Sequence, residues 1–326
     1  MNIQTQIETA QIIYAKELVK LLFPNDSWLM KSVSHDAYVK GKSVQVDQFS
    51  GKPKSRKNKV NLKIDAVRRT LTKKSYDISE FATDPEAIVF TEAMLSNPQL
   101  RSATMEAHKE TLQEDVAMDL KSQWAATEAE RIIRTTGATN VAAGATGATG
   151  TRKSVAYVDF LNAWNQLNTD KVPLEGRQVL VPVTMLPQLF QIEEFIKYDF
   201  ISDRNGMPIK SGVIGNILGM EVWVDLDDFP VQYDDTATPV PEGLVPDDDG
   251  SPGGVTYAGA IDNNLSIMVW HEKFVTRAKG AAQVFIQLKH PEYQSDIMST
   301  NCIAGGSKLR KDNRGVVNIV ETLVTT

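Results

Sequence analysis

A long basic segment, residues 38–74, constrains this chain most strongly, because its pattern predicts a β-hairpin that lacks a core of its own. Residues 38–47 and 60–67 each alternate apolar and polar side chains, as half-buried strands do. Between them, residues 49–59 form a polar tip with Gly51 and Pro53 as turn residues. A lone two-stranded hairpin is marginally stable in water, and the segment's twelve lysines and arginines repel one another. We therefore expect the hairpin to lie on another surface, of this chain or of a neighbour, as an assembly device.

Acidic residues are concentrated far along the chain from this basic segment. From Glu221 to Glu272 there are twelve aspartates and glutamates and no lysine or arginine. Within this stretch, residues 225–254 form an acidic, proline- and glycine-rich insert that is expected to be a solvated loop. One interpretation is that both charge runs are solvated loops. The other is that the basic hairpin of one subunit meets the acidic segment of another, which would set partner choice and register. The predicted acidic partner surface is Asp225, Asp227, Asp228, Asp234 and Asp235.

Composition narrows the class of protein. A chain of 326 residues is long enough for two domains or one elaborate domain. No apolar run approaches the ~18 residues needed to cross a bilayer, and residues 1–8 lack the features of a secretion signal. The single cysteine, Cys302, excludes internal disulfides and cysteine-based metal clusters. A net charge of −6 is unlike the basic excess of most nucleic-acid-binding domains.

The first half of the chain is predicted to be extended and helical. Residues 3–22 have apolar positions at helical spacing and form an N-terminal arm. A short strand at 75–81 follows the hairpin, and residues 84–86 resemble the start of a short helix. The longest helix is expected at 98–134, with Asn97 as its cap. Every fourth residue of one face of that helix is apolar: Leu112, Val116, Leu120 and Trp124. At ~1.5 Å per residue such a helix is roughly 50 Å long, which suits an extended tile better than a compact enzyme.

A low-complexity tract at 137–150 is the clearest boundary, and it is expected to be a flexible loop. The second half has an α/β pattern, with a helix at 157–167, a buried strand at 176–183 and a helix that Pro187 opens. Residues 214–224 indicate a strand pair or a bent strand, and 267–271 another strand. Segments 283–288 and 315–320 alternate as antiparallel strands, with Gly305 and Gly306 in their connection.

No motif predicts catalysis, a cofactor or a metal site. The four histidines are scattered, and no residue pair reads as nucleophile and base. The glycine tract lacks the Gly-Lys-Ser/Thr ending of a phosphate-binding loop. Asp247, Asp248 and Asp249 are consecutive, whereas the ligands of a calcium loop are spaced by two. We therefore expect a structural protein and not an enzyme.

The order of elements resembles that of a tailed-bacteriophage major capsid protein, whose fold is shared with bacterial encapsulins. An N-terminal arm leads into a basic hairpin, a short strand, a very long helix, an α/β region and final strands that return to the first half. The most specific stretches are residues 177–182 leading into 186–189, residues 214–223, and the late strand 265–270 with residues 271–275. The resemblance covers essentially the whole chain and implies an α+β capsid fold.

The resemblance also implies a domain plan and a role. It assigns an N-terminal arm to 1–33, an extended hairpin loop to 34–72, and a peripheral domain to 73–135 and 275–326 with a spine helix at 98–134. The axial domain would be 136–274, with the insert 225–254 facing the capsomer axis or the outer surface. The hairpin would lie across an adjacent subunit, with apolar residues buried there and basic residues facing acids. The implied contacts are Val44, Val46, Lys52, Lys54, Arg56, Lys57, Lys59, Leu62 and Ile64.

Identical copies would then form the pentamers and hexamers of an icosahedral shell around packaged double-stranded DNA, bound without sequence specificity and without any membrane. Such a shell would be a virion capsid assembled in the host bacterial cytoplasm, together with portal and decoration proteins. Because this sequence begins almost directly at the arm, a separate scaffolding protein is expected. Two rival hypotheses are an encapsulin-like compartment, and an α/β enzyme whose basic arm binds nucleic acid or an acidic substrate.

Overall fold

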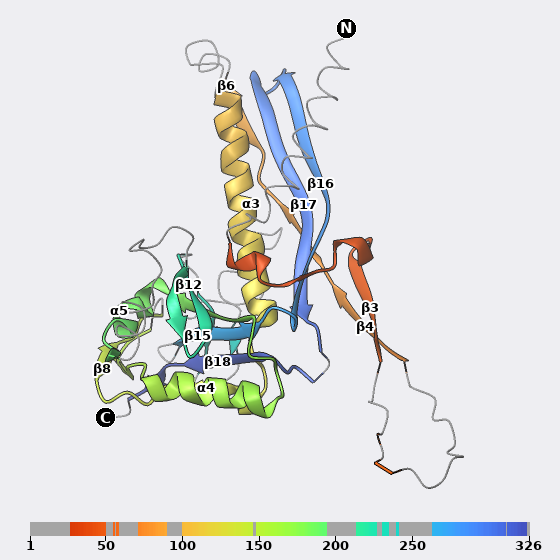
Figure 1. Cartoon of the computed structure of the whole chain (residues 1–326). Coiled ribbons are helices and arrows are strands. Elements are labelled where there is room, and N and C mark those ends of the chain that lie inside the picture. Colours follow the sequence, from red (N-terminus) through yellow and green to blue (C-terminus); the bar gives the residue numbers. More distant parts are fainter. Residues whose placement is uncertain are drawn as a thin grey trace, which may run out of the picture.

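A long limb, a compact lobe and a hairpin beside the limb make up this chain in a computed structural model (Figure 1). The structure describes residues 27–49, 55, 57–58, 71–89, 100–145, 148–193, 213–226, 230–234, 239–240, 263–310 and 312–324. The predicted helix 3–22, the predicted strand 60–67 and most of the acidic insert lie outside the described residues. Among the described helices, none combines the length and the apolar character needed to cross a membrane.

The limb consists of helix α3 (Leu100–Trp124) and a five-stranded sheet. Its main strands are β16 (Val275–His290) and β17 (Ser295–Lys308), an antiparallel pair that lies along α3 (Figure 1). Three short strands complete the sheet: β1 (Val33–Ser34), β5 (Ser79–Ala82) and β6 (Glu86–Val89). The predicted stripe of α3 is confirmed, because Leu112, Val116, Leu120 and Trp124 have no exposed surface. These side chains share one core with Cys302 and Ala304 of β17.

Two predictions for the limb are wrong. Residues 86–89 form strand β6 instead of a helix, because they pair with Ser295–Met298 of β17. Gly305 and Gly306 lie within β17 instead of a connection. A Cβ atom at Gly306 would meet Leu120 of α3 and the main chain of Thr276. The glycine therefore lets the helix and the neighbouring strand approach closely, as glycines inside strands often do.

The spine helix is shorter than predicted, because it ends at Trp124 and not at Arg134. Beyond it lie a 3₁₀ turn, η3 (Ala129–Arg131), and strand β7 (Ile132–Arg134). Side chains from distant segments bind the main chain where the helix would have continued. Asn318 Oδ1 accepts from Ala126 N at 2.9 Å, and Tyr233 OH donates to Ala126 O at 2.8 Å. These bonds satisfy groups that a longer helix would have used internally.

The lobe is built on an eight-stranded sheet with the order β11-β12-β10-β15-β13-β14, to which β18 and β7 are added. Its strands are β10 (Arg177–Pro182), β11 (Val213–Ile217), β12 (Met220–Asp225), β13 (Gln232–Tyr233), β14 (Pro239–Val240), β15 (Asn264–His271) and β18 (Val316–Val320). The predicted strand at 176–183, the strand pair at 214–224 and the strand at 267–271 are confirmed. β10 runs parallel to β12 and antiparallel to β15, so it lies in the centre of the sheet.

Helix α4 (Tyr157–Thr169) covers the lobe sheet, and its predicted position is confirmed. Phe160, Ala163 and Leu167 of α4 have no exposed surface and pack with Val179 and Val317 of the sheet. The turn η4 (Val183–Met185) and the short helix α5 (Leu186–Leu189) follow β10. The core that contains the stripe of α3 also includes Leu180 of β10 and Trp223 of β12, so limb and lobe share it, whereas the core under α4 belongs to the lobe.

The glycine-rich tract is not simply a loop. The tract contains strand β8 (Asn140–Ala142), which pairs with β9 (Thr151–Lys153). Strand β9 also pairs with β19 (Thr322–Leu323) near the end of the described residues. Strand β18 lies in the lobe sheet, between β15 and β7. The segment 275–326 therefore divides between the limb and the lobe, whereas the sequence assigned all of it to one domain.

Candidate assembly interface

The hairpin beside the limb has a different register from the predicted one. After a tight turn at Gly41, β2 (Val39–Lys40) pairs with β3 (Ser43–Phe49), which pairs with β4 (Leu71–Asp77). The ladder runs from Ser43 opposite Asp77 to Phe49 opposite Leu71. The partner of the first strand is thus 71–77, not 60–67. Ile78 N donates to Lys42 O at 2.9 Å, and this bond fixes β4 at the root of the hairpin.

Val44 is one of the predicted intersubunit contacts, but its side chain is fully buried within its own chain. It packs with Ile78 and with Ala278 of β16, and Val46 is half-buried at the margin of the same cluster. A fully buried side chain offers no surface to a neighbouring subunit. Lys57 is exposed. The other predicted contacts lie outside the described residues: Lys52, Lys54, Arg56, Lys59, Leu62 and Ile64.

Polar contacts also fasten the hairpin root to the limb. The hydroxyl of Tyr76 lies 3.1 Å from His35 Nδ1, and Thr276 Oγ1 donates to it at 3.3 Å. Burial raises the pKa of Tyr76 and lowers the pKa of His35, so both groups favour their neutral forms. Lys42 Nζ lies 2.5 Å from Glu80 Oε2. Charged hydrogen bonds from Lys42 and Asn301 lower the pKa of Glu80.

The segment before β1 packs into the same region through Trp28, which contacts one tryptophan of the limb and one of the lobe. The turn η1 (Trp28–Met30) places Trp28 edge-on to Trp124 of α3 and to Trp270 of β15, at centroid distances of 5.7 and 6.2 Å. Trp270 Nε1 donates to Lys31 O at 2.9 Å. Aromatic pairs of this geometry add stabilisation beyond the area that they bury. This cluster joins arm, limb and lobe at one point.

Arg277 of β16 binds the main chain of the arm just beyond these tryptophans. Its guanidinium donates to Ser32 O at 2.5 Å and to Met30 O at 3.2 Å. A second turn, η2 (Asp36–Tyr38), follows β1, and Asp36 Oδ1 accepts from Lys279 N at 2.9 Å. The described part of the arm is therefore held along β16 by repeated polar contacts.

Asp225 does not belong to an acidic surface. It ends β12 and forms an ion pair with Lys121 of α3, with both side chains almost fully buried, at 3% and 1% exposure. The two Asp225 oxygens lie 3.1 and 2.9 Å from Lys121 Nζ. The predicted partner Asp234 is half-buried, and Asp227, Asp228 and Asp235 lie outside the described residues.

Lys121 is not among the site residues predicted from the sequence, although it is one half of this buried pair. It follows Leu120 of the apolar stripe, so its position at the edge of the buried face was a signal that could have been used. The pair connects limb to lobe through two charges that water does not reach. Such a buried pair orients the two parts, because neither charge tolerates separation from the other.

The described residues contain no group of three or more His, Cys, Asp or Glu side chains arranged to hold a metal ion. Burial raises the pKa of the Cys302 thiol to about 12, which makes it unreactive in the folded chain.

No family model and no curated protein matches this sequence. Solved structures with the same fold do match, and each covers about nine-tenths of both chains. The capsid of the cyanophage P-SCSP1u has a TM-score of 0.58 at 15% identity, over 91% of this chain and 87% of that one. The capsid of Ralstonia phage GP4 has a TM-score of 0.59 at 12% identity, over 91% and 88%. The capsid of the Helicobacter pylori bacteriophage KHP30 has a TM-score of 0.58 at 12% identity, over 92% and 93%. The predicted α+β fold of tailed-phage capsids is therefore confirmed.

Proposed function

We propose that this chain is the major capsid protein of a tailed bacteriophage, and that its copies assemble into the pentamers and hexamers of an icosahedral shell around double-stranded DNA. The observation that carries the proposal is the match of about nine-tenths of the chain to the folds of phage capsids. The proposed location is the virion, after assembly in the cytoplasm of the host. Scaffolding, portal and decoration proteins are the proposed further partners.

The hairpin supports this proposal through the packing of its root and the charge of the segment beyond the root. The root packs on its own limb through Val44 and Tyr76. The segment 50–70, which joins β3 to β4, contains eight of the twelve cations of residues 38–74. Repulsion among these cations favours a partner with opposite charge. A neighbouring copy supplies such a partner in its acidic stretch 221–272.

The domain plan that goes with this role is also proposed. The arm would be 1–33, the extended loop 34–72, and the axial domain 136–274. The peripheral domain would be 73–135 and 275–326, although β7 and β18 of these segments join the lobe sheet. Many weak contacts, each made once per subunit, would stabilise a closed shell through their number.

Sedimentation velocity of the purified chain over a wide concentration range tests the proposal. Assembly predicts species of five or six subunits, or much larger particles, and a chain of 36.1 kDa that stays monomeric at high concentration would refute it. A second test replaces Lys52, Lys54, Arg56 and Lys57 by serine. The expected result is weaker assembly with a smaller dependence on salt. Unchanged assembly and unchanged salt dependence would show that the hairpin tip does not meet acidic groups.

A further inference from the structure

Lys74 of the hairpin and Lys308 of the limb lie together, and no carboxylate of the described residues hydrogen-bonds to either ammonium group. Lys74 Nζ, on β4, donates to the main-chain oxygen of Lys308 at the end of β17, and at 3.3 Å to that of Arg310. Lys308 Nζ donates to Ala125 O at 2.6 Å and to Thr127 Oγ1 at 3.4 Å. Among the described residues, the partners of both ammonium groups are thus uncharged oxygens. Two adjacent cations with only neutral partners leave local positive charge unbalanced.

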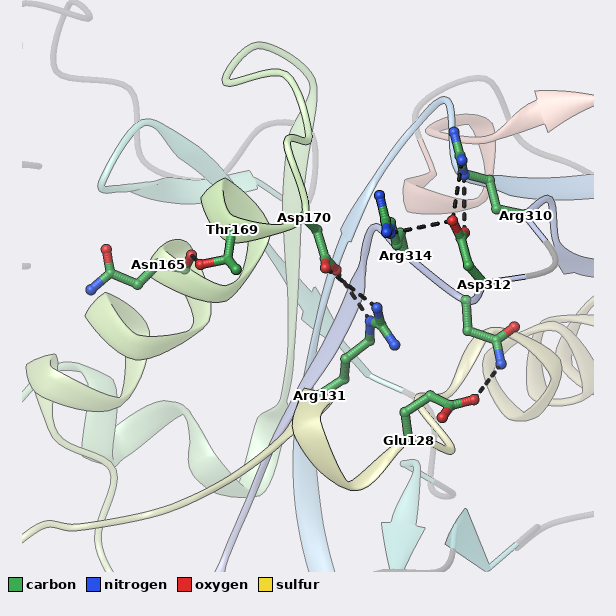
Figure 2. Close-up of polar contacts among 9 residues, drawn as sticks. Glu128, Arg131, Asn165, Thr169, Asp170, Arg310, Asp312 and Arg314 are labelled. Atoms are coloured by element: carbon green, nitrogen blue, oxygen red, sulfur yellow. Dashed lines mark hydrogen bonds and ion pairs between the residues drawn. The ribbon is translucent and has the colours of Figure 1, made fainter. Parts of the chain in front are cut away.

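The nearby carboxylates are already engaged by other groups. Asp312 accepts from Arg310 at 3.0 and 3.1 Å, and it lies 3.2 Å from Arg314. Asp170 is paired with Arg131 at 3.2 Å. Glu128 Oε1 accepts from Asn313 Nδ2 at 2.8 Å. Figure 2 shows these groups converging from α4, the segment after α3 and the loop between β17 and β18. With the two lysines the site holds five cations and three carboxylates, so its formal charge is positive.

Electrostatics at the site favour an added anion. Burial above all, together with the charges of Lys74 and Arg131 and against the pull of Glu128, lowers the pKa of Lys308 to about 8. Burial also lowers the pKa of Lys74, against the pull of Asp312. Both side chains are half-buried, so they remain accessible from the surface. A partly desolvated cation whose hydrogen-bond acceptors are neutral is destabilising, and a carboxylate in direct contact with it offsets that cost.

We propose that Lys74 and Lys308 form an oxyanion-binding site that receives an aspartate or glutamate side chain from a second copy of this chain. The inference rests on the proposed function, since it requires assembled subunits. A second copy is favoured because its residues 221–272 contain no base and still carry ten acids besides Glu221 and Asp225, which pair with Lys31 and Lys121 of their own chain. Phosphates of DNA are disfavoured because the net charge of the chain is −6. The contact would hold the hairpin root of one subunit to the acidic stretch of the next.

Zero-length coupling tests the contact directly. Assembled protein made from a mixture of ¹⁴N- and ¹⁵N-labelled chains is treated with a water-soluble carbodiimide near pH 8, digested and analysed by mass spectrometry. The expected product is an amide between Lys74 or Lys308 and an acid of 221–272, with mixed labels that prove coupling between copies. Coupling only within one chain, to Glu128 or Asp312, would overturn the proposal.

A pair of variants provides an independent check. Lys74→Gln and Lys308→Gln remove the charge and keep an N–H donor, and Lys73→Gln is the matched control, because Lys73 is the exposed neighbour of Lys74 on β4. The critical concentration for assembly is expected to rise about tenfold in the double variant that carries both glutamines, and to be unchanged in the control. Lys308→Arg, which keeps the charge, should restore part of the loss. Assembly equal to that of the control would overturn the site.

The outcomes separate this inference from the proposed function. Shells that form without the inter-copy amide, and that form equally well from the glutamine variants, would overturn the oxyanion site and leave the capsid role intact. A wild-type chain that never assembles would overturn both. Variants that assemble normally but package less DNA would also overturn the inference, because the lysines would then bind phosphate.

Discussion

Replacing Asp225 by asparagine removes one member of the ion pair that joins α3 to the lobe. The change leaves the ammonium group of Lys121 buried, at 1% exposure, beside a neutral amide. Removing one partner of a buried pair costs about 3–5 kcal/mol, because the remaining charge loses its close counter-ion at a place where little water can replace it. Lys121→Met removes the other charge of the pair, leaves the carboxylate of Asp225 buried, and should lower the free energy of unfolding by a similar amount. At roughly 2 °C per kcal/mol for a chain of this size, each variant should lower Tm by about 6–10 °C.

The double variant Lys121→Met with Asp225→Leu makes this prediction sharper. Both charges are then replaced by apolar groups of similar volume, so the free energy of unfolding should return to within about 2 kcal/mol of the wild type. The matched control is Lys31→Met, which breaks the exposed pair between Lys31 and Glu221 of the same strand, β12. That pair is about one-third exposed on each side, so its loss should cost at most about 1 kcal/mol.

Urea unfolding followed by tryptophan fluorescence measures all four variants, because Trp124 lies one helical turn from Lys121. The reasoning would be refuted by single variants no worse than Lys31→Met. It would also be refuted by a double variant that costs the sum of the two single changes, since the two charges would then act independently.

Three further predictions concern other buried groups. Trp28→Ala removes a ring that is 8% exposed between Trp124 and Trp270, and should lower the free energy of unfolding by about 3–4 kcal/mol, measured by urea unfolding. Burial raises the pKa of Glu321 from 4.5 to about 7, so this carboxyl makes folding less favourable as pH rises through that range. Glu321→Gln should therefore stabilise the chain at pH 8, by at most about 3 kcal/mol, and change little at pH 4, whereas equal effects at both pH values would contradict this reasoning. Cys302, which is 1% exposed, should react with a thiol reagent only after unfolding; rapid modification of the native protein would show that the limb core opens.

Local patterns in the sequence predicted the elements that are governed by their own side-chain periodicity. The four-residue spacing of Leu112 to Trp124 identified the buried face of α3, and the β-rich run at 176–183 identified the central strand of the lobe. Both predictions depend only on which side chains avoid water. The resemblance to phage capsids rested on the order of such elements, which is why the fold class could be anticipated.

Features that depend on distant contacts could not be predicted in the same way. The helical composition of 125–134 favours a longer helix, but Asn318 and Tyr233 bind its main chain and end it at Trp124. Residues 60–67 alternate well, yet the strand opposite β3 is 71–77 because contacts at Lys42 and Ile78 set the register. A strand pattern shows that alternate side chains are buried without showing which surface buries them.

The same limitation affected the candidate interface. Val44 was predicted to contact a neighbour and packs instead on Ala278 of its own limb. Asp225 looked like one of a row of solvated acids, but its carboxylate is buried against Lys121, 104 residues earlier. Charge runs in a sequence indicate net fields, whereas individual pairings depend on tertiary packing.

Cryo-electron microscopy of the purified chain, alone or with a co-expressed scaffolding protein, tests the central claim most directly. The account predicts closed shells of five-fold and six-fold capsomers in which the segment between β3 and β4 of one subunit lies across the next. Particles that never progress beyond single subunits, or shells in which each such segment contacts only its own subunit, would contradict it.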